Sequence, residues 1–518
     1  MNIIVLVCDT LRASNLACYG YDKNTSPGID KIAEQGMRFS NIFSAINATD
    51  PSFTTLFTGK YPLSHGVIHH GDRVTEVEKS YAANSIFLPE VLREHGFVTI
   101  GVDWLGKWHK RGFDYYGRIK KPAFENEKIE AGGDSQKRAP ADKGLHLKSL
   151  PATLKKCFLE SFLSFSEHNV YYSLPSSVRD RIRQFLVFYY EEIQKGLPPL
   201  KKSPMLSDSA AFSDLAIRYI REFAGKRDFF LFVHYWDNHI PYTAPRTVVD
   251  RFLRDYRYPD EPVASILKSL SGTKAERLFH RSTRGKTPRT AGEIIAHYDA
   301  SINYVDSNIS RIYECLEETR ILDDTFVIVT SDHGESLTEH DIFFLHHGLY
   351  DSVIRIPLIM SGPGIPSGRV CDALVQNFDL MPTICDMAGI KDVGGSFDGD
   401  SLLKLARNES WDRHFVYAEE VNAQRKRMIR DKNYKYIKAL DNEKCIYCQK
   451  YHSKGDEFYD LQSDPEEKEN IVSNPKHREY EDQLEKYIDA LDKPKEGKEA
   501  AFGDEQEINT RLQALGYI

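Results

Sequence analysis

The chain has 518 residues, 41% of them hydrophobic, so it can bury a large core and form more than one domain. Its formal net charge of -8 gives no general attraction to nucleic acid or to an acidic membrane, so an anion-binding site has to be built locally. The apolar runs are too short to cross a bilayer and no basic leader precedes the first of them, which predicts a soluble, cytoplasmic protein without a membrane span.

The first predicted element is a continuous apolar run at residues 2–8, which is typical of a strand buried on both faces of a parallel sheet. A helix is expected over 26–36, followed by a strand over 37–43. The same alternation continues with helices at 88–95, 211–224 and 294–318 and strands at 97–102, 229–234 and 325–330. It predicts an α/β fold, a three-layer α/β/α sandwich around a mainly parallel sheet.

Two segments interrupt this alternation. Residues 118–204 are rich in Lys and are interpreted as a helical insertion that caps the main domain. Residues 250–290 are charged and irregular and are expected to form a lid. After residue 408, short strand candidates and a final helix predict a small α/β C-terminal subdomain, so the expected domains are 1–408 and 409–518.

Polar residues follow two of the predicted strands directly, at the edge where ligands bind in open α/β sheets. Asp9 comes after the first strand, where a carboxylate is costly unless it is paired or bound to metal; helix capping is the alternative. Asp332 and His333 follow the strand at 325–330. Together, Asp9, Asp332 and His333 predict a metal site.

A third segment, residues 49–59 (TDPSFTTLFTG), resembles the signature of the sulfatase family within the alkaline phosphatase superfamily. In that family a Cys or Ser is oxidised to formylglycine, the nucleophile. Thr49 stands at this position and Phe53 replaces an Arg. The residues that match the signature are Pro51, Ser52, Leu56, Thr58 and Gly59.

Further segments extend the resemblance over most of the chain outside 118–204. Residues 106–109 (GKWH) match the second sulfatase signature, in which Lys and His hold the anion; here these are Lys107 and His109. His239 lies in a segment similar to the family's His-x-Pro motif. Segments at 354–359, 458–461 and 515–518 also resemble sulfatases. The resemblance makes 1–408 the catalytic domain.

The metal motifs depart from the family pattern. Typical sulfatases bind calcium through Asp-Asp and Asp-Asn pairs, whereas this chain has Asp9-Thr10 and Asp332-His333. One carboxylate is lost and one nitrogen ligand is gained. Because imidazole suits transition metals better than calcium, one divalent ion is expected, with zinc or manganese favoured over calcium.

Thr49 cannot become formylglycine, and the pattern resembles the Thr-dependent relatives that act on phosphorus. The predicted function is metal-dependent hydrolysis of a phosphoric mono- or diester, on a small molecule or glycan, with Thr49 as fourth metal ligand and nucleophile. Lys107 and His109 are expected to stabilise the developing charge, and His239 and His347 are candidates to protonate the leaving group.

Three other functions stay open from the sequence: a sulfuric ester hydrolase, a phospho-group transferase acting on a glycan or lipid, and a non-catalytic binding protein. No feature indicates the oligomeric state. Cys445 and Cys448, with His452 four residues on, are interpreted as either a metal cluster or a reduced pair in a C-terminal hairpin, and the hairpin is favoured because a fourth ligand is missing. His340 and His346 are left open between site and surface roles.

Overall fold

The computed structural model describes residues 1–518 except 104, 118–208, 255–257, 284–287, 493 and 495–518. The predicted insertion at 118–204 and the terminal match at 515–518 therefore lie outside the described residues. Among the helices within the described ranges, none combines the length and the apolar character needed to cross a membrane.

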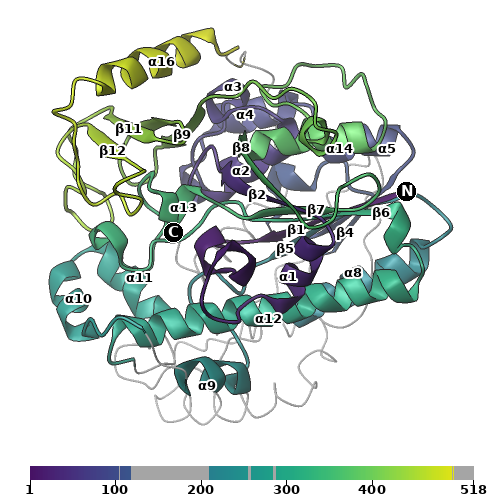
Figure 1. Ribbon diagram of the computed structural model, residues 1–518, viewed down its shortest axis with the longest axis horizontal. Helices are drawn as coiled ribbons and strands as arrows, with labels where there is room; N and C mark the ends of the chain where they lie inside the picture. Colours follow the sequence, from purple (N-terminus) through teal and green to yellow (C-terminus); the bar gives the residue numbers. More distant parts are fainter. Residues whose placement is uncertain (104, 118–208, 255–257, 284–287, 493, 495–518) are drawn as a thin grey trace, which may run out of the picture.

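An eight-stranded sheet in the order β4-β3-β5-β1-β6-β7-β2-β8 forms the centre of the molecule (Figure 1). Neighbouring strands pair in parallel except β7, which is antiparallel to both β6 and β2. The strands are β1 (Asn2–Cys8), β2 (Met37–Phe43), β3 (Val98–Val102), β4 (Tyr115–Gly117), β5 (Phe229–Tyr235), β6 (Thr325–Thr330), β7 (Leu358–Ser361) and β8 (Arg369–Gln376).

Helices cover both faces of this sheet, which confirms the predicted α/β/α sandwich (Figure 1). One face carries α1 (Pro27–Glu34), α8 (Ser209–Phe223) and α12 (Ala291–Glu318), and the other carries α2 (Thr49–Thr58), α5 (Leu88–Glu94) and α14 (Leu380–Met387). Shorter helices are α3 (Pro62–His65), α4 (Glu76–Asn84), α13 (Asp351–Ile354) and α15 (Leu403–Ala406).

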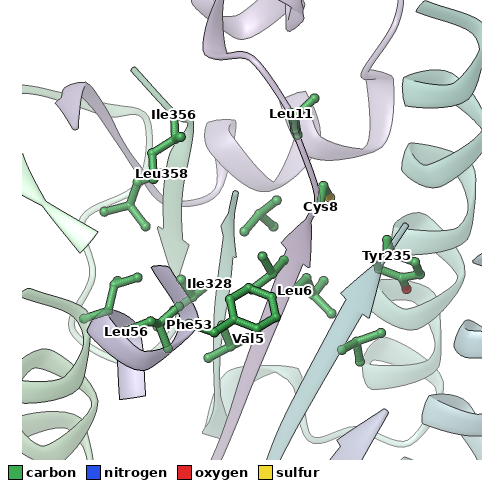
Figure 2. Packing of buried hydrophobic residues seen from close by; sticks show 14 of the residues in the cluster. Val5, Leu6, Cys8, Leu11, Phe53, Leu56, Tyr235, Ile328, Ile356 and Leu358 are labelled. Carbon is green, nitrogen blue, oxygen red and sulfur yellow. The ribbon is translucent and has the colours of Figure 1, made fainter. Parts of the chain in front are cut away.

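The core lies between α2 and the central strands. Figure 2 shows Phe53 of α2 among side chains of β1 and β6, including Val5 and Ile328, and all three are fully buried. Every residue of β1 is buried, because this strand has a sheet neighbour on each side and helices above and below. The apolar run that predicted a central strand is therefore explained.

The segment at 250–290 was expected to be irregular, but the structure shows helices there. Its described part forms α9 (Arg246–Arg254), α10 (Val263–Leu270) and α11 (Lys274–Ser282). Among the charged residues, a few apolar residues recur at helical spacing. Those that are buried are Ile266, Leu270, Ala275 and Phe279. Phe279 contacts Phe344 in the loop after β6, with ring centroids 5.7 Å apart.

The predicted C-terminal subdomain is an antiparallel sheet in the order β12-β11-β10-β9, with one long helix. Its elements are β9 (Val416–Glu420), β10 (Lys426–Arg430), β11 (Tyr434–Ala439), β12 (Glu457–Asp460) and α16 (His477–Ala490). Tyr480, Leu484 and Ile488 of α16 pack in one apolar cluster with Ile429 and Tyr436 of the sheet. A bridge between Ile46 and Glu419 joins this subdomain to the main domain.

Candidate active site

Three of the predicted site residues meet at the carboxyl ends of the central parallel strands. Asp9 follows β1, and Asp332 and His333 follow β6, the strand paired with β1. One ligand atom of each lies within 4.8 Å of the other two, and all three side chains are buried. The pairing of β1 with β6 thus brings together residues that are more than 300 positions apart in the sequence.

The donor set fits a divalent cation. Asp9 Oδ1 and Asp332 Oδ2 are buried, and neither has a hydrogen-bond partner among the residues that the structure describes. Burial and the Asp332 carboxylate raise the pKa of Asp9 above its ordinary value, a repulsion that a cation would remove. His333 Nδ1 donates to the Gly334 carbonyl at 2.9 Å, which leaves the Nε2 lone pair for a metal.

Thr49 is the first residue of α2 and lies beside this group. Its Oγ1 is 3.5 Å from His333 Nε2, and its side chain is buried. Ser52, one turn along α2, donates from Oγ to the Asp332 carbonyl at 2.8 Å. This hydrogen bond ties the start of α2 to the loop that carries Asp332 and His333.

The next residue, Asp50, is surrounded by hydrogen-bond donors and cations. Lys107 Nζ donates to its Oδ2 at 2.8 Å, and the Gly71 amide donates to the same oxygen at 2.9 Å. His70 Nδ1 lies 3.0 Å from that oxygen. Burial opposes ionisation, but the charge of Lys107 holds the pKa of Asp50 well below its usual range. Asp50 is therefore a buried carboxylate at neutral pH.

Lys107 and His109, which were predicted to bind the anion of the substrate, thus contact other residues of the chain. Lys107 forms an ion pair with Asp50, and His109 Nε2 donates to the Asp50 carbonyl at 3.1 Å. Burial lowers the pKa of His109 to about 4, so its ring is neutral at pH 7. His109 therefore supports the first turn of α2 without contributing positive charge.

His239 lies near the metal-binding group through His346. The ring centroid of His346 is 4.5 Å from that of His333 and 5.8 Å from that of His239. His239 Nδ1 donates to the Ile240 carbonyl at 3.0 Å, and burial holds the pKa of His239 well below its usual value. Burial likewise lowers the pKa of His346 to about 4, so both rings are neutral.

His347 lies against the C-terminal subdomain. Its ring stacks on Tyr447 with centroids 4.4 Å apart, and its centroid is 6.4 Å from that of His346. His340 stacks on Tyr350 at 3.5 Å. Of the histidines after β6, His346 is therefore the one whose ring the structure places beside His333.

Asp9 is hydrogen-bonded to a buried chain of polar groups. His234 of β5 lies with Nε2 3.2 Å from Asp9 and Nδ1 2.9 Å from Asp103, and Tyr116 donates to Asp103 at 2.5 Å. Burial disfavours a charged ring, but the two carboxylates raise the pKa of His234 to about 10. Phe53 covers this imidazolium edge-on, with centroids 4.7 Å apart.

Four residues of this site were not singled out from the sequence: Asp50, His70, Asp103 and His234. His234 is the sixth residue of a strand recognised by its apolar run, and a polar residue inside such a run is a usable signal. Asp103 directly follows β3, as Asp9 follows β1. Asp50 and His70 lie in no strand-end pattern, and only the folded chain brings them together.

Buried carboxylates, an imidazole and a hydroxyl thus lie together at the carboxyl edge of the sheet, where open α/β folds bind their ligands. The sulfatase family model matches residues 1–390, and the model of the N-sulphoglucosamine sulphohydrolase C-terminal region matches residues 338–494. The chain belongs to the sulfatase family, and its resemblance to this family is confirmed.

Two known relatives match nearly the whole chain. It is 23% identical to the N-acetylglucosamine-6-O-sulfatase of Bacteroides thetaiotaomicron, over 95% of this chain and 86% of that protein. It is 24% identical to the arylsulfatase of Clostridium perfringens, over 97% of this chain and 96% of that protein. The protein is a sulfatase-family ester hydrolase.

Solved structures agree on the fold. The phosphonate monoester hydrolase of Agrobacterium radiobacter superposes with a TM-score of 0.63 at 19% identity, covering 95% of each chain. A protein solved in complex with its substrate D-glucosamine-2-N,6-O-disulfate gives a TM-score of 0.61 at 18% identity, covering 94% of this chain and 96% of that one. These structures share the alkaline phosphatase-like architecture.

Proposed function

We propose that the protein hydrolyses sulfuric esters, carried on a glycan or a small molecule, with Thr49 as nucleophile and one divalent metal. The observation that supports this proposal is the buried ion pair between Asp50 and Lys107 beside Thr49. Because Asp50 neutralises Lys107, we infer that the site accepts a group that carries a single negative charge.

The charges of the site balance before the substrate enters. A divalent cation is matched by Asp9 and Asp332, the His234 imidazolium by Asp103, and Lys107 by Asp50. The imidazoles of His109 and His346 have lowered pKa values and are neutral. Each further negative charge is therefore uncompensated in a buried site, where Coulomb energies are large. A sulfate ester carries one such charge, whereas a phosphate monoester carries two at neutral pH.

The chain's own groups divide the chemistry between them. Thr49 Oγ1 forms the bond to sulfur as the bond from sulfur to the ester oxygen breaks, and water then releases sulfate from Thr49. A bound divalent metal, held by Asp9, Asp332, His333 and Thr49, supplies the charge that acidifies this hydroxyl. We infer that the neutral rings of His239 and His346 exchange protons with the leaving group.

The relatives favour sulfur over the phosphoric ester placed first by the sequence analysis. N-acetylglucosamine-6-O-sulfatase and arylsulfatase both match nearly the whole chain. The phosphoric ester was predicted from the Thr at the nucleophile position, because Thr-dependent relatives act on phosphorus. We therefore place sulfate esters first and phosphate monoesters last.

Esters of phosphorus with one negative charge are the second candidate. Phosphonate monoesters and phosphodiesters carry the same charge as a sulfate ester, and phosphonate monoester hydrolases are among the similar structures. Thr49 needs no oxidation to attack either element.

A side-by-side assay of an aryl sulfate, a phosphodiester, a phosphonate monoester and a phosphate monoester tests the proposal. We expect turnover of the monoanionic esters, fastest for sulfate, and poor turnover of the dianionic phosphate monoester. Asp50→Asn should raise the relative rate on the phosphate monoester, because Lys107 is then uncompensated. A wild-type enzyme that prefers the phosphate monoester would overturn the charge argument, and one that prefers phosphodiesters or phosphonates would overturn the choice of sulfur.

Metal analysis on the same preparation tests the cofactor. Because His333 contributes nitrogen, we expect zinc or manganese to restore activity after chelation, and calcium to restore little. Full activity with calcium alone would contradict this assignment.

A further inference from the structure

A second group of metal-ligand side chains lies in the connection between β11 and β12, outside the active site. One ligand atom each of Cys445, Cys448 and His452 lies within 4.8 Å of the other two. Cys448 Sγ is 3.1 Å from His452 Nε2, and both cysteines are buried free thiols. Two cysteines separated by two residues, with a nearby His, are the ligand types of structural zinc sites.

The turn that carries the two cysteines directs backbone amides at both sulfurs. The amides of Tyr447 and Cys448 are hydrogen-bonded to the Cys445 sulfur, and the amide of Lys450 is hydrogen-bonded to the Cys448 sulfur. The turn is closed by the Gln449 amide, which donates to the Cys445 carbonyl at 2.9 Å. It holds both sulfurs within 4.8 Å of a ring nitrogen of His452.

The imidazole of His452 is oriented as a ligand. Its Nδ1 donates to the His340 carbonyl at 3.4 Å, so the lone pair is on Nε2, the atom that faces Cys448 Sγ. A carbonyl on the far nitrogen is the usual support of a metal-bound His. His333 in the active site has the same arrangement with the Gly334 carbonyl.

We propose that Cys445, Cys448 and His452 bind a structural zinc ion and that His347 completes the site as fourth ligand. The ring of His347 stacks on Tyr447, between the two cysteines in sequence, and its centroid is 6.4 Å from that of His452. Its Nε2 is buried and has no hydrogen-bond partner within the described part of the chain. A fourth nitrogen ligand gives the closed Cys2His2 set typical of structural zinc.

Such an ion joins three parts of the molecule next to the active site. Cys445, Cys448 and His452 belong to the C-terminal subdomain, whereas His347 belongs to the loop after β6 that also carries His346. Helix α11 is tied to the same turn, because the Ala275 amide donates to the Tyr447 carbonyl at 2.8 Å. The zinc ion thus holds in place the loop that brings His346 beside His333.

Metal content of the full-length protein is the first test. We expect two metal equivalents per chain, one of them zinc. Cys445→Ser/Cys448→Ser should lose one zinc equivalent and keep the metal of Asp9, Asp332 and His333, while Cys18→Ser keeps both. Asp332→Asn should show the reverse, losing the active-site metal and keeping the zinc. A wild-type protein with one equivalent, unchanged by the double substitution, would overturn the proposal.

Two further readouts do not depend on how well a variant folds or on enzyme activity. Cobalt exchanged into the wild-type protein should show near-ultraviolet thiolate-to-cobalt absorption, which oxygen and nitrogen ligands alone do not give. Thiol titration after chelation and denaturation should find all eight cysteines of the sequence. Six thiols would show a Cys445–Cys448 disulfide instead of a metal site.

His347→Gln should weaken zinc binding, and undiminished affinity would remove His347 as the fourth ligand.

Discussion

Thr49 and its neighbour Asp50 differ in their charge at neutral pH. The Thr49 hydroxyl has to become negative to act, whereas Asp50 is already ionised and is held by Lys107 and His70. Phe53, at the position where sulfatases carry an Arg, adds no charge and instead covers the ring of His234. Lys107 and the His234 imidazolium are therefore each matched by a carboxylate of the chain, and the group proposed to activate Thr49 is a bound metal.

Replacing Thr49 tests its role as nucleophile. Thr49→Ala should abolish ester cleavage, because the attacking oxygen is removed, while the fold and the metal content are retained. Thr49→Ser should keep part of the activity, because it keeps the oxygen. Single-turnover rates and elemental analysis on both variants measure this. Near-wild-type cleavage by Thr49→Ala would show that another group attacks the ester.

Lys107 is expected to affect stability as well as rate. Lys107→Met leaves the Asp50 carboxylate buried without its main cation, which costs about 3–5 kcal/mol of unfolding free energy. Lys107→Met/Asp50→Asn removes the charge from both partners and should recover most of that loss. Urea unfolding of the wild type, both single variants and the double variant gives the coupling energy. Additive effects would show that the pair is not coupled.

The residues of the proposed metal site could be named from the sequence because they lie within three positions of the end of a predicted strand. Asp9, Asp332 and His333 needed only the rule that parallel strands end at a common edge. The partners of Lys107 could not be found in this way. Asp50 lies inside a sequence motif at a position where no particular residue type was expected, and His70 lies in a loop, so their contact with Lys107 depends on how α2 is packed.

Helix α2 positions the nucleophile through contacts along its whole length. Ser52 Oγ donates to the Asp332 carbonyl, and the helix ends at Gly59, whose φ of 64° favours glycine. A Cβ at Gly59 would lie 2.8 Å from Phe397, so glycine is also required by packing. These contacts explain why Ser52 and Gly59 belong to the motif although neither reacts.

Ser52→Ala tests this positioning. The substitution removes the bond to the Asp332 carbonyl and the acceptor of the Asn377 Nδ2 bond, at about 1 kcal/mol each, but a misplaced nucleophile can cost on the order of 100-fold in turnover. We expect the fall in kcat to exceed what the stability change predicts. Thr58→Val, which removes a hydrogen bond at the far end of the same helix, is the matched control. Equal effects of the two substitutions on kcat would contradict the positioning role.

At the scale of elements, the central strands β1, β2, β3, β5 and β6 and their helices α1, α5, α8 and α12 were predicted nearly to the residue, because long apolar runs and helix-end signals agree there. Strands β4, β7 and β8 and helix α14 were not predicted. Helix α2 was not predicted as a helix, since its residues form a motif of Thr, Ser and Phe with little helical periodicity. Helices α10 and α11 were missed because their exposed charges obscure short apolar stripes.

The whole molecule is expected to lose stability in mild acid. His65 is fully buried with both ring nitrogens paired: Nε2 donates to Thr55 Oγ1 at 2.9 Å, and Nδ1 accepts from the Val67 amide at 3.1 Å. Burial lowers the pKa of His65 to about 3. As the pH falls from the ordinary histidine value of about 6.5 towards this pKa, only the unfolded chain takes up the proton, at a cost of about 1.4 kcal/mol per pH unit.

His65→Gln should therefore flatten the dependence of unfolding free energy on pH over this range. Urea unfolding measured at neutral pH and at about two units lower gives the slope. His414→Gln, at an exposed site, should leave the slope of the wild type unchanged. If His65→Gln has the same slope as the wild type, His65 does not contribute to the loss of stability at acidic pH.

The central place of β1 has a consequence for the synthesis of the chain. This strand is made first, but its two neighbours, β5 and β6, begin at Phe229 and Thr325. At about 5–20 residues per second, the ribosome needs roughly 15–60 s to deliver β6 after β1 has emerged. Throughout that time the fully buried strand β1 has no sheet partner on one side, so the nascent chain should bind chaperones through this strand.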